Sequence, residues 1–205
     1  MNPYYWFCYN LIKLVGRICF RLRIVHRERM INHGPVILAA NHQSFLDPPF
    51  AGSASDRGIY FLARKSLLDG PFFGWLLPKL NVIPVDSDSG KDRTALKALI
   101  RILKAGEGTL VFPEGGRTPD GSLQPALPGV GLVIAKTLAP VVPMRIFGAY
   151  EAWPMGQKFP RFRPVTVVVG EPIYFTAADV EGGGKDLYTQ LSQRVFDAIA
   201  SLSLD

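Results

Sequence analysis

A histidine and an aspartate separated by four residues, His42 and Asp47, are the side chains of this sequence most suited to acid–base chemistry. The apolar run 36–40 precedes them and predicts a short buried strand. Ser44 and Asp47 have the spacing of a capping box, which predicts a helix that begins near Phe45. The imidazole would then lie in the turn between strand and helix, within reach of the carboxylate. Such a histidine has one nitrogen fixed as a donor and the other free to accept a proton, as a general base requires. The alternative is a structural hydrogen-bonded pair.

A second polar stretch follows another predicted strand, 109–112. Its residues are Pro113, Glu114, Gly115, Gly116, Arg117 and Thr118. Glycines let backbone amides approach a bound oxyanion, and an arginine binds phosphate through two parallel hydrogen bonds. Glu114 could orient Arg117 or accept a hydroxyl, and Lys65, at the end of the predicted strand 59–63, is a further phosphate ligand. A plain surface loop and a solvated lysine are the alternatives.

The elements that must position these residues alternate between strands and helices. Strands are predicted at 36–40, 59–63, 81–86, 109–112, 141–146 and 165–169, and helices at about 92–105, 131–138 and 187–202. Residues 66–80 predict a broken helical segment with an exposed apolar side, and 87–93 a loop. The alternation predicts a single layered α/β domain with a largely parallel sheet flanked by helices. In that sheet the strand ends at His42 and Glu114 could face one crevice.

Composition and charge exclude several classes of protein. Of the 205 residues 48% are hydrophobic and 20% charged, which indicates a folded chain of about one domain. The net charge of +6 indicates an anionic partner, but no zinc-finger or RNP-type signature favours nucleic acid. Cys8 and Cys19 resemble reduced thiols of a cytosolic protein, and the histidines are too dispersed to predict a metal site. No serine-hydrolase elbow, P-loop or dinucleotide fingerprint is present.

Residues 1–30 hold much of the excess positive charge. The basic residues there are Lys13, Arg17, Arg21, Arg23, Arg27 and Arg29, against the single acid Glu28. On a helical projection Tyr4, Cys8, Leu11, Ile12, Val15, Cys19 and Leu22 share the other side. The apolar run is too short for a membrane span, so we expect residues 1–30 to be an amphipathic membrane-associating arm in the cytoplasmic leaflet. The catalytic domain would be residues 31–205. An ordinary helix packed on the domain is the alternative.

The two polar stretches, in this order, resemble the blocks of the glycerolipid acyltransferase family. The first block, Asn-His-x4-Asp, is matched by Asn41, His42 and Asp47; the third, Phe-Pro-Glu-Gly-x-Arg-Ser/Thr, by 112–115, Arg117 and Thr118. Residues 63–65 are similar to the basic stretch between the blocks and 142–144 to the fourth block. The sequence departs from the family at Ser87, where the second block has an arginine, and at Gly116, where threonine or serine is frequent.

This resemblance implies an O-acyltransferase of phospholipid biosynthesis. It would move a fatty acyl group from acyl-CoA or acyl carrier protein to the free hydroxyl of a lysophospholipid, chiefly 1-acylglycerol 3-phosphate (lysophosphatidic acid), giving phosphatidate. His42 would be the base and Asp47 its orienting partner; the acceptor would be bound by Glu114, Gly115, Gly116, Arg117 and Lys65. Backbone amides after Ser44 are the candidate oxyanion donors. No cofactor or metal is implied.

The same resemblance implies a peripheral or monotopic protein at the cytoplasmic face of the cell membrane, in contact with membrane lipids. Three alternatives stay open at this point. The acceptor could be glycerol 3-phosphate or another lysophospholipid, His42 could activate water in a hydrolase, or the chain could be a non-catalytic module that binds lipid phosphate.

Overall fold

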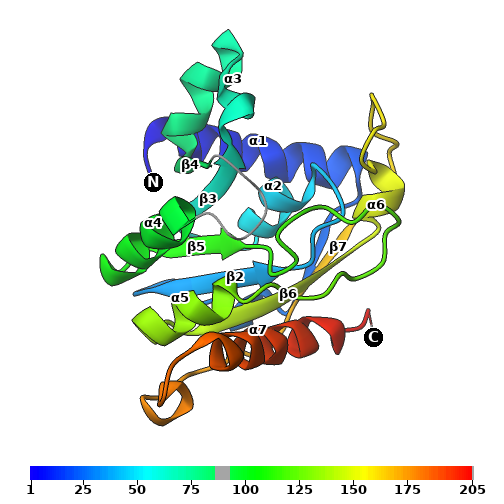
Figure 1. Cartoon of the computed structure of the whole chain (residues 1–205). Helices are drawn as coiled ribbons and strands as arrows, with labels where there is room; N and C mark the ends of the chain where they lie inside the picture. Colours follow the sequence, from blue (N-terminus) through cyan, green and yellow to red (C-terminus); the bar gives the residue numbers. More distant parts are fainter. Residues whose placement is uncertain (86–92, 205) are drawn as a thin grey trace.

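A mixed seven-stranded sheet lies between two layers of helices in the computed structural model, which describes residues 1–85 and 93–204 (Figure 1). Its spatial order is β1-β7-β6-β2-β5-β3-β4. The strands are β1 (Arg23–Val25), β2 (Val36–Ala40), β3 (Ile59–Arg64), β4 (Val82–Val85), β5 (Gly108–Val111), β6 (Val141–Phe147) and β7 (Thr166–Val169). The strands from β6 to β4 are parallel, β7 runs antiparallel to β6, and β1 runs parallel to β7. The expectation of a largely parallel sheet is confirmed.

The centre of the sheet explains where the two polar stretches end up. Strand β2 is apolar along its whole length and fully buried, as a strand covered on both faces must be. It pairs with β5 so that Ala39 lies opposite Val111. His42 and Glu114 each follow their paired residue by three positions, so they leave neighbouring strands at the same edge of the sheet.

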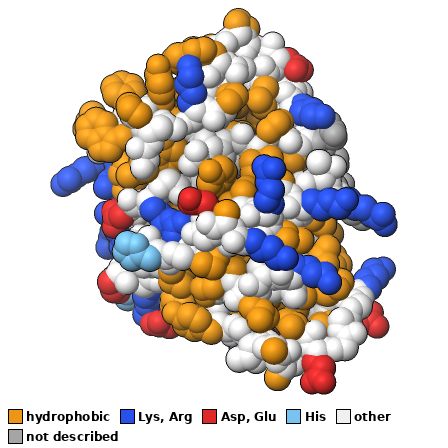
Figure 2. All heavy atoms as spheres, turned by 90° about the vertical axis from the view of Figure 1, so that its left-hand side faces the viewer, with side chains coloured by type: hydrophobic (Ala, Val, Ile, Leu, Met, Phe, Trp, Pro, Cys, Tyr) orange, Lys and Arg blue, Asp and Glu red, His pale blue; other side chains and the backbone are white. Residues whose placement is uncertain are grey.

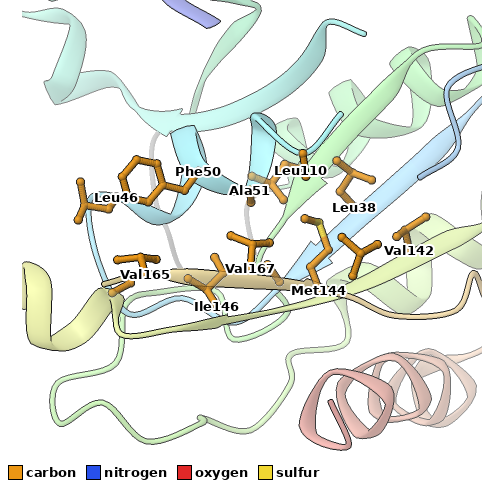
Figure 3. Packing of buried hydrophobic residues seen from close by; sticks show 14 of the residues in the cluster. Leu38, Leu46, Phe50, Ala51, Leu110, Val142, Met144, Ile146, Val165 and Val167 are labelled. Atoms are coloured by element: carbon orange, nitrogen blue, oxygen red, sulfur yellow. The ribbon is translucent and has the colours of Figure 1, made fainter. Parts of the chain in front are cut away.

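Helices cover both faces of the sheet. They are α1 (Pro3–Cys19), α2 (Asp47–Gly52), α3 (Pro71–Leu76), α4 (Arg93–Lys104), α5 (Gly129–Thr137), α6 (Ala149–Ala152) and α7 (Lys185–Ala200), with 3-10 turns η1 (Arg27–Arg29), η2 (Lys65–Leu68), η3 (Leu77–Leu80) and η4 (Ala178–Val180). Helices α1 and α2 lie against a core that includes Phe50, Leu38 and Met144 (Figure 3). Helices α4, α5 and α7 close a second core on the opposite face, around Ile37 and Val133.

The predicted arm is a helix only over α1. Residues 23–25 form β1 instead, an edge strand beside β7, which charged neighbours and a length of three residues hid from the sequence pattern. The predicted apolar side of α1 is divided in two. Ile12 and Cys19 pack on the core, as the packed-helix alternative expects. Tyr4, Leu11 and Val15 of that side lie exposed, and so do Phe7, Leu14 and Ile18, which the projection did not place on it.

Among the described residues no helix is both long and apolar enough to cross a membrane. The division between residues 1–30 and 31–205 stays a prediction.

The broken helical segment predicted at 66–80 is confirmed as η2, α3 and η3, and the proline-containing strand β4 lies at the sheet edge as expected. The predicted loop 87–93 lies almost entirely outside the described residues, as does Ser87. The helix predicted to begin near Phe45 is α2, which begins two residues later, at Asp47. Proline follows at positions 48 and 49, where the missing N–H groups of a first helical turn cost nothing.

Candidate active site

The turn between β2 and α2 holds His42 and Asp47 in direct contact. His42 Nδ1 lies 2.9 Å from Asp47 Oδ2, and the histidine side chain is 17% exposed while the aspartate is fully buried. An ionised carboxylate only accepts hydrogen bonds, so Nδ1 carries the proton and Nε2 keeps its lone pair. The pair thus has the arrangement of a base whose orienting partner is shielded from water.

The backbone of the turn is folded around the Asp47 carboxylate. Its Oδ2 also accepts from Gln43 N at 2.5 Å and from Ser44 N at 2.6 Å. The bond to Ser44 N is one half of the predicted capping box; in the other half Ser44 Oγ accepts from Leu46 N rather than from Asp47 N. Asp47 therefore fixes the imidazole and the chain that carries it with a single oxygen.

An aromatic ring fixes the plane of the imidazole. The rings of Phe112 and His42 are stacked, with centroids 3.9 Å apart and planes 13° from parallel. Phe112 comes directly after β5, so the neighbouring strand supplies this support. The contact leaves the imidazole little freedom to rotate away from Asp47.

Glu114 joins the two strand ends through both of its oxygens. His42 N donates to Oε1 at 2.7 Å and Gln124 N donates to Oε2 at 2.8 Å. Burial raises the pKa of the Glu114 carboxyl from 4.5 to about 7, the Asp47 carboxylate adds to the rise, and the two backbone donors oppose it. The side chain is 8% exposed, so it serves first to hold the backbone of His42 and the loop after Arg117 in place.

Arg117 is brought to the His42 turn by two contacts. Its guanidinium carbon lies 3.7 Å from the centroid of the Phe45 ring, a cation–π geometry. The next residue, Thr118, donates its N–H to His42 O at 2.9 Å. The two contacts tie Arg117 to the turn that carries His42, whereas the prediction that the imidazole and the guanidinium line one lipid-facing pocket stays a prediction.

The remaining predicted ligands, Gly115, Gly116 and Lys65, lie at the same edge of the sheet but differ in their surroundings. Gly115 has φ +71° and donates its N–H to Phe112 O, which makes the tight turn after β5. A Cβ on Gly116 would meet nothing within 4 Å, so the space beside its backbone is open. Lys65 is exposed at the start of η2, just past β3, the other neighbour of β5. Its part in binding stays a prediction.

Comparison with known proteins decides the family. A family model described as Acyltransferase matches residues 21–147, a span that contains His42, Asp47, Glu114 and Arg117. The chain belongs to the acyltransferase family. The sequence resemblance to glycerolipid acyltransferases is thereby confirmed at the level of the family.

Two relatives show how far the likeness of this chain extends. The chloroplastic 1-acyl-sn-glycerol-3-phosphate acyltransferase of Brassica napus is 31% identical over 148 residues, which are 71% of this chain and 43% of that protein. The 1-acyl-sn-glycerol-3-phosphate acyltransferase of Bacillus subtilis is 25% identical over 171 residues, 83% of this chain and 82% of that one. This chain thus spans less than half the length of the chloroplastic relatives that it matches.

The crystal structure of a 1-acyl-sn-glycerophosphate acyltransferase from Thermotoga maritima has the same fold. It superposes with a TM-score of 0.75 at 24% identity, covering 98% of this chain and 81% of that one. At this level of identity the superposition shows the fold, and it includes the helix-covered sheet described above.

The acyltransferase also positions its site with residues to which sequence reasoning gave no role. Asn41 is buried and spans two strands: its amide donates to Ile146 O at 3.0 Å and accepts from Ile146 N at 2.7 Å. This clamp holds the end of β2 against β6. For Asn41, its place in the first block was a usable signal, whereas nothing in the sequence points to Gln124 as a partner of Glu114.

The expected oxyanion donors are largely engaged within the acyltransferase itself. Leu46 N donates to Ser44 Oγ at 3.2 Å and Asp47 N to Ser44 O at 3.4 Å. The amides of Gln43 and Ser44 donate to Asp47 Oδ2. A turn folded around its own carboxylate therefore offers few N–H groups to a substrate, and this expectation is weakened.

A hollow of about 660 Å³ lies beside the loop that follows Arg117. Gln43 Nε2 donates to Gly121 O at 2.8 Å and so ties one wall of the hollow to the His42 turn. Its charged lining residues are Arg161, Arg163, Asp120 and Glu151. Two cations and two anions balance, so the hollow does not by its charge select the phosphates of an acyl donor. In the described part of the chain no cluster of histidine, cysteine and acidic residues has the makings of a metal site.

Proposed function

We propose that this acyltransferase transfers a fatty acyl group from a thioester to the free hydroxyl of 1-acylglycerol 3-phosphate, giving phosphatidate. The observation that carries the proposal is the arrangement around His42, with Nδ1 bound to a buried carboxylate and Arg117 tied to the same turn. A base and a phosphate ligand side by side suit an acceptor that has a hydroxyl and a phosphate on one glycerol. The names of the relatives from Brassica napus and Bacillus subtilis support the same acceptor.

The chemistry requires one proton to be moved twice. The acceptor oxygen attacks the thioester carbonyl while His42 Nε2 takes the hydroxyl proton, so no nucleophile from the enzyme is needed. Asp47 stabilises the imidazolium that forms, as the aspartate does in a Ser-His-Asp triad. The tetrahedral intermediate then expels the thiolate, which takes the proton from Nε2. An ester and a free thiol leave, and His42 is neutral again.

Proton transfer supplies only part of the rate. A positioned general base contributes about 10²–10⁴-fold, and holding thioester and hydroxyl together supplies the remainder. In this scheme Arg117 binds the acceptor phosphate, with Lys65 as a second cation. Gly116 leaves room for the glycerol backbone, and Gly115 makes the turn that carries it. Glu114 keeps the two strand ends in register.

The acceptor's place in a bilayer gives the outer face of α1 a role. Its exposed residues Tyr4, Phe7, Leu11, Leu14 and Ile18 recur every three or four positions, which puts them along one line of the helix. From Pro3 to Arg27 the chain has basic residues and no acid. A helix of this kind lies in the plane of an anionic leaflet rather than across it. We place the protein as peripheral or monotopic at the cytoplasmic face.

A panel assay tests the function directly. Purified protein would be incubated with acyl-CoA or acyl carrier protein as donor, and with 1-acylglycerol 3-phosphate, glycerol 3-phosphate or other lysophospholipids as acceptor. Mass spectrometry would identify the product. We expect phosphatidate and free thiol in equal amounts, and we expect His42→Ala to reduce the rate about 10²–10⁴-fold without unfolding the protein.

Other results of this assay favour the other readings. Release of free fatty acid without an ester product would indicate a hydrolase. Binding of the acceptor without thiol release would indicate a lipid-phosphate-binding module. If His42→Ala turned over at nearly the wild-type rate, the assignment of the base would be wrong.

A further inference from the structure

Helix α3 is built almost entirely of apolar residues that the protein itself does not bury. Its sequence is Pro71-Phe72-Phe73-Gly74-Trp75-Leu76, and none of the six residues is buried. Phe72, Phe73 and Trp75 are 64%, 52% and 52% exposed. In Figure 1 the helix projects from the body of the molecule, away from both cores. Three large aromatic side chains held on a projecting element indicate a partner outside the chain.

The exposed aromatic residues of α3 are continuous with those of α1. The Tyr4 and Trp75 rings meet edge to face with centroids 5.6 Å apart. Asn2, which caps α1, also donates its amide to Lys79 O at 2.8 Å and so fastens η3 to the same helix end. In Figure 2 hydrophobic side chains gather over the upper part of the molecule, the part in which Figure 1 places α3. The two helices therefore present one surface, which we call the α1–α3 face.

A lysine on this face favours lipid over protein as the partner. Lys79 Nζ lies 3.5 Å from the centroid of the Trp75 ring and 4.7 Å from that of Tyr4. Lysine is depleted from the centres of protein interfaces, whereas at a bilayer surface it keeps its ammonium among the headgroups above buried aromatic rings. Between Arg57 and Val85 the described chain has a single acid, Asp69, so the surroundings of α3 favour an anionic surface.

The turn that carries α3 is tightly built. A Cβ on Gly74 would approach Leu68 O to 2.4 Å, so only glycine lets α3 pack this closely against η2. Gly74 N donates to Gly70 O at 2.7 Å. A fixed turn presents the aromatic residues in one direction, as insertion into one leaflet requires.

We propose that α3 is a membrane-inserting element, which places Phe72, Phe73 and Trp75 among the acyl chains of an anionic bilayer while Lys79 stays at the headgroups. The inference rests on the proposed function in that the lipid acceptor enters from the same bilayer. It adds to the arm of α1 a second contact, far from it in sequence. Two elements on one continuous face would hold the enzyme in one orientation on the membrane.

Trp75 can report its own depth. In the full-length protein with Trp6→Phe and Trp153→Phe, Trp75 is the remaining tryptophan. On addition of phosphatidylglycerol–phosphatidylcholine vesicles its emission should shift to shorter wavelength, and lipids brominated on the acyl chains should quench it. Absence of both changes while the protein is bound to the vesicles would overturn the proposal.

A double variant and a matched control test how much Phe72 and Phe73 contribute to the affinity for vesicles. Phe72→Ser with Phe73→Ser should weaken vesicle binding by about tenfold or more, because both rings leave the bilayer. Tyr174→Ser is the control: Tyr174 is 67% exposed but adjoins Ile173, which bridges to Val141 in the strand β6. It should bind vesicles like the wild type. Equal binding by the double variant, or loss of self-association in place of lipid binding, would refute a lipid contact.

Activity measurements separate this proposal from the proposed function. With a short-chain acceptor dispersed in solution, the double variant should transfer acyl groups at the wild-type rate, and with the acceptor in vesicles more slowly. A chain that bound vesicles through α3 but transferred no acyl group to any acceptor would refute the function and leave the membrane contact standing.

Discussion

The side chains of the His42 site are buried and hydrogen-bonded, whereas those of the α1–α3 face are exposed. At the site, Asp47 is fully buried and each oxygen of Glu114 has a backbone donor. On the face, Phe72 and Ile18 are 64% and 70% exposed. The site is therefore held by contacts within the protein, whereas the face is left for a surface outside it.

This difference shows what each task requires. Acyl transfer needs an imidazole held in one orientation and one tautomer, and a buried carboxylate and a stacked ring provide both. Contact with a bilayer needs apolar area that folding has not already covered. Substitutions at the site should thus change chemistry or stability and leave vesicle binding intact, while substitutions on the face should do the reverse.

The largest effect is expected from Asp47→Asn. The amide oxygen can take the place of Oδ2, but the NH₂ group then enters the position of Oδ1, which is buried with no hydrogen-bond partner among the described residues. Acyl transfer should fall about 10²–10⁴-fold. An unsatisfied buried donor should also lower the free energy of unfolding by about 1–3 kcal/mol, measured by urea denaturation.

His42→Ala is the control that separates chemistry from stability. The His42 side chain is partly exposed, so the variant should show a comparable fall in the rate of acyl transfer with a smaller change in the free energy of unfolding. Both variants should bind vesicles like the wild type. Asp47 lies outside the apolar core yet organises the turn, so its substitution should disturb the fold more than that of His42. Wild-type stability of Asp47→Asn would contradict this role.

The sequence was sufficient for the parts of the site that follow from local order. A continuous apolar run predicts β2, and the capping spacing predicts a helix after it, so His42 and Asp47 fall together within one turn. Contacts between distant segments carry no such pattern. The Phe45 ring under Arg117 and the Gln124 amide on Glu114 depend on how two loops pack, which no spacing records.

The absence of a sequence pattern for contacts between distant segments also explains the errors in the predicted fold. A helical projection of α1 finds apolar residues but cannot say which of two sides meets the core, and Ile12 and Leu11 end on different ones. Strand β1 is three residues long and begins with an arginine, so only its pairing with β7 makes it a strand. Tertiary pairing overrides local preference in both places.

Arg117→Ala tests a different property of the same site, its affinity for the phosphate of the acceptor. A hydrogen bond to a charged group contributes about 1.5–3 kcal/mol, so the KM for 1-acylglycerol 3-phosphate should rise about 10- to 100-fold with little change in kcat. The effect should vanish for a monoacylglycerol, which has no phosphate. Arg194→Ala is the control, since Arg194 is an exposed arginine on α7 that pairs with Asp179. A fall in kcat at constant KM would mean that Arg117 acts on the transition state instead.

The effect most specific to burial concerns the pH dependence of stability, and it is spread over more than two pH units. Burial raises the pKa of Glu114 to about 7, above the 4.5 of the unfolded chain, so between these values the folded state binds more protons than the unfolded one. The contribution of Glu114 to the free energy of unfolding should therefore decrease as pH rises from about 4.5 to about 7, by up to about 3 kcal/mol.

Glu114→Gln removes this titration and makes the effect measurable. Urea unfolding of wild type and variant at several pH values should give a difference in stability that declines across this window. The glutamine also places an NH₂ group against one of the two backbone donors, which lowers stability equally at all pH values. Only the slope reports the buried carboxyl, and a flat difference would mean that Glu114 is as well solvated as a residue on the α1–α3 face.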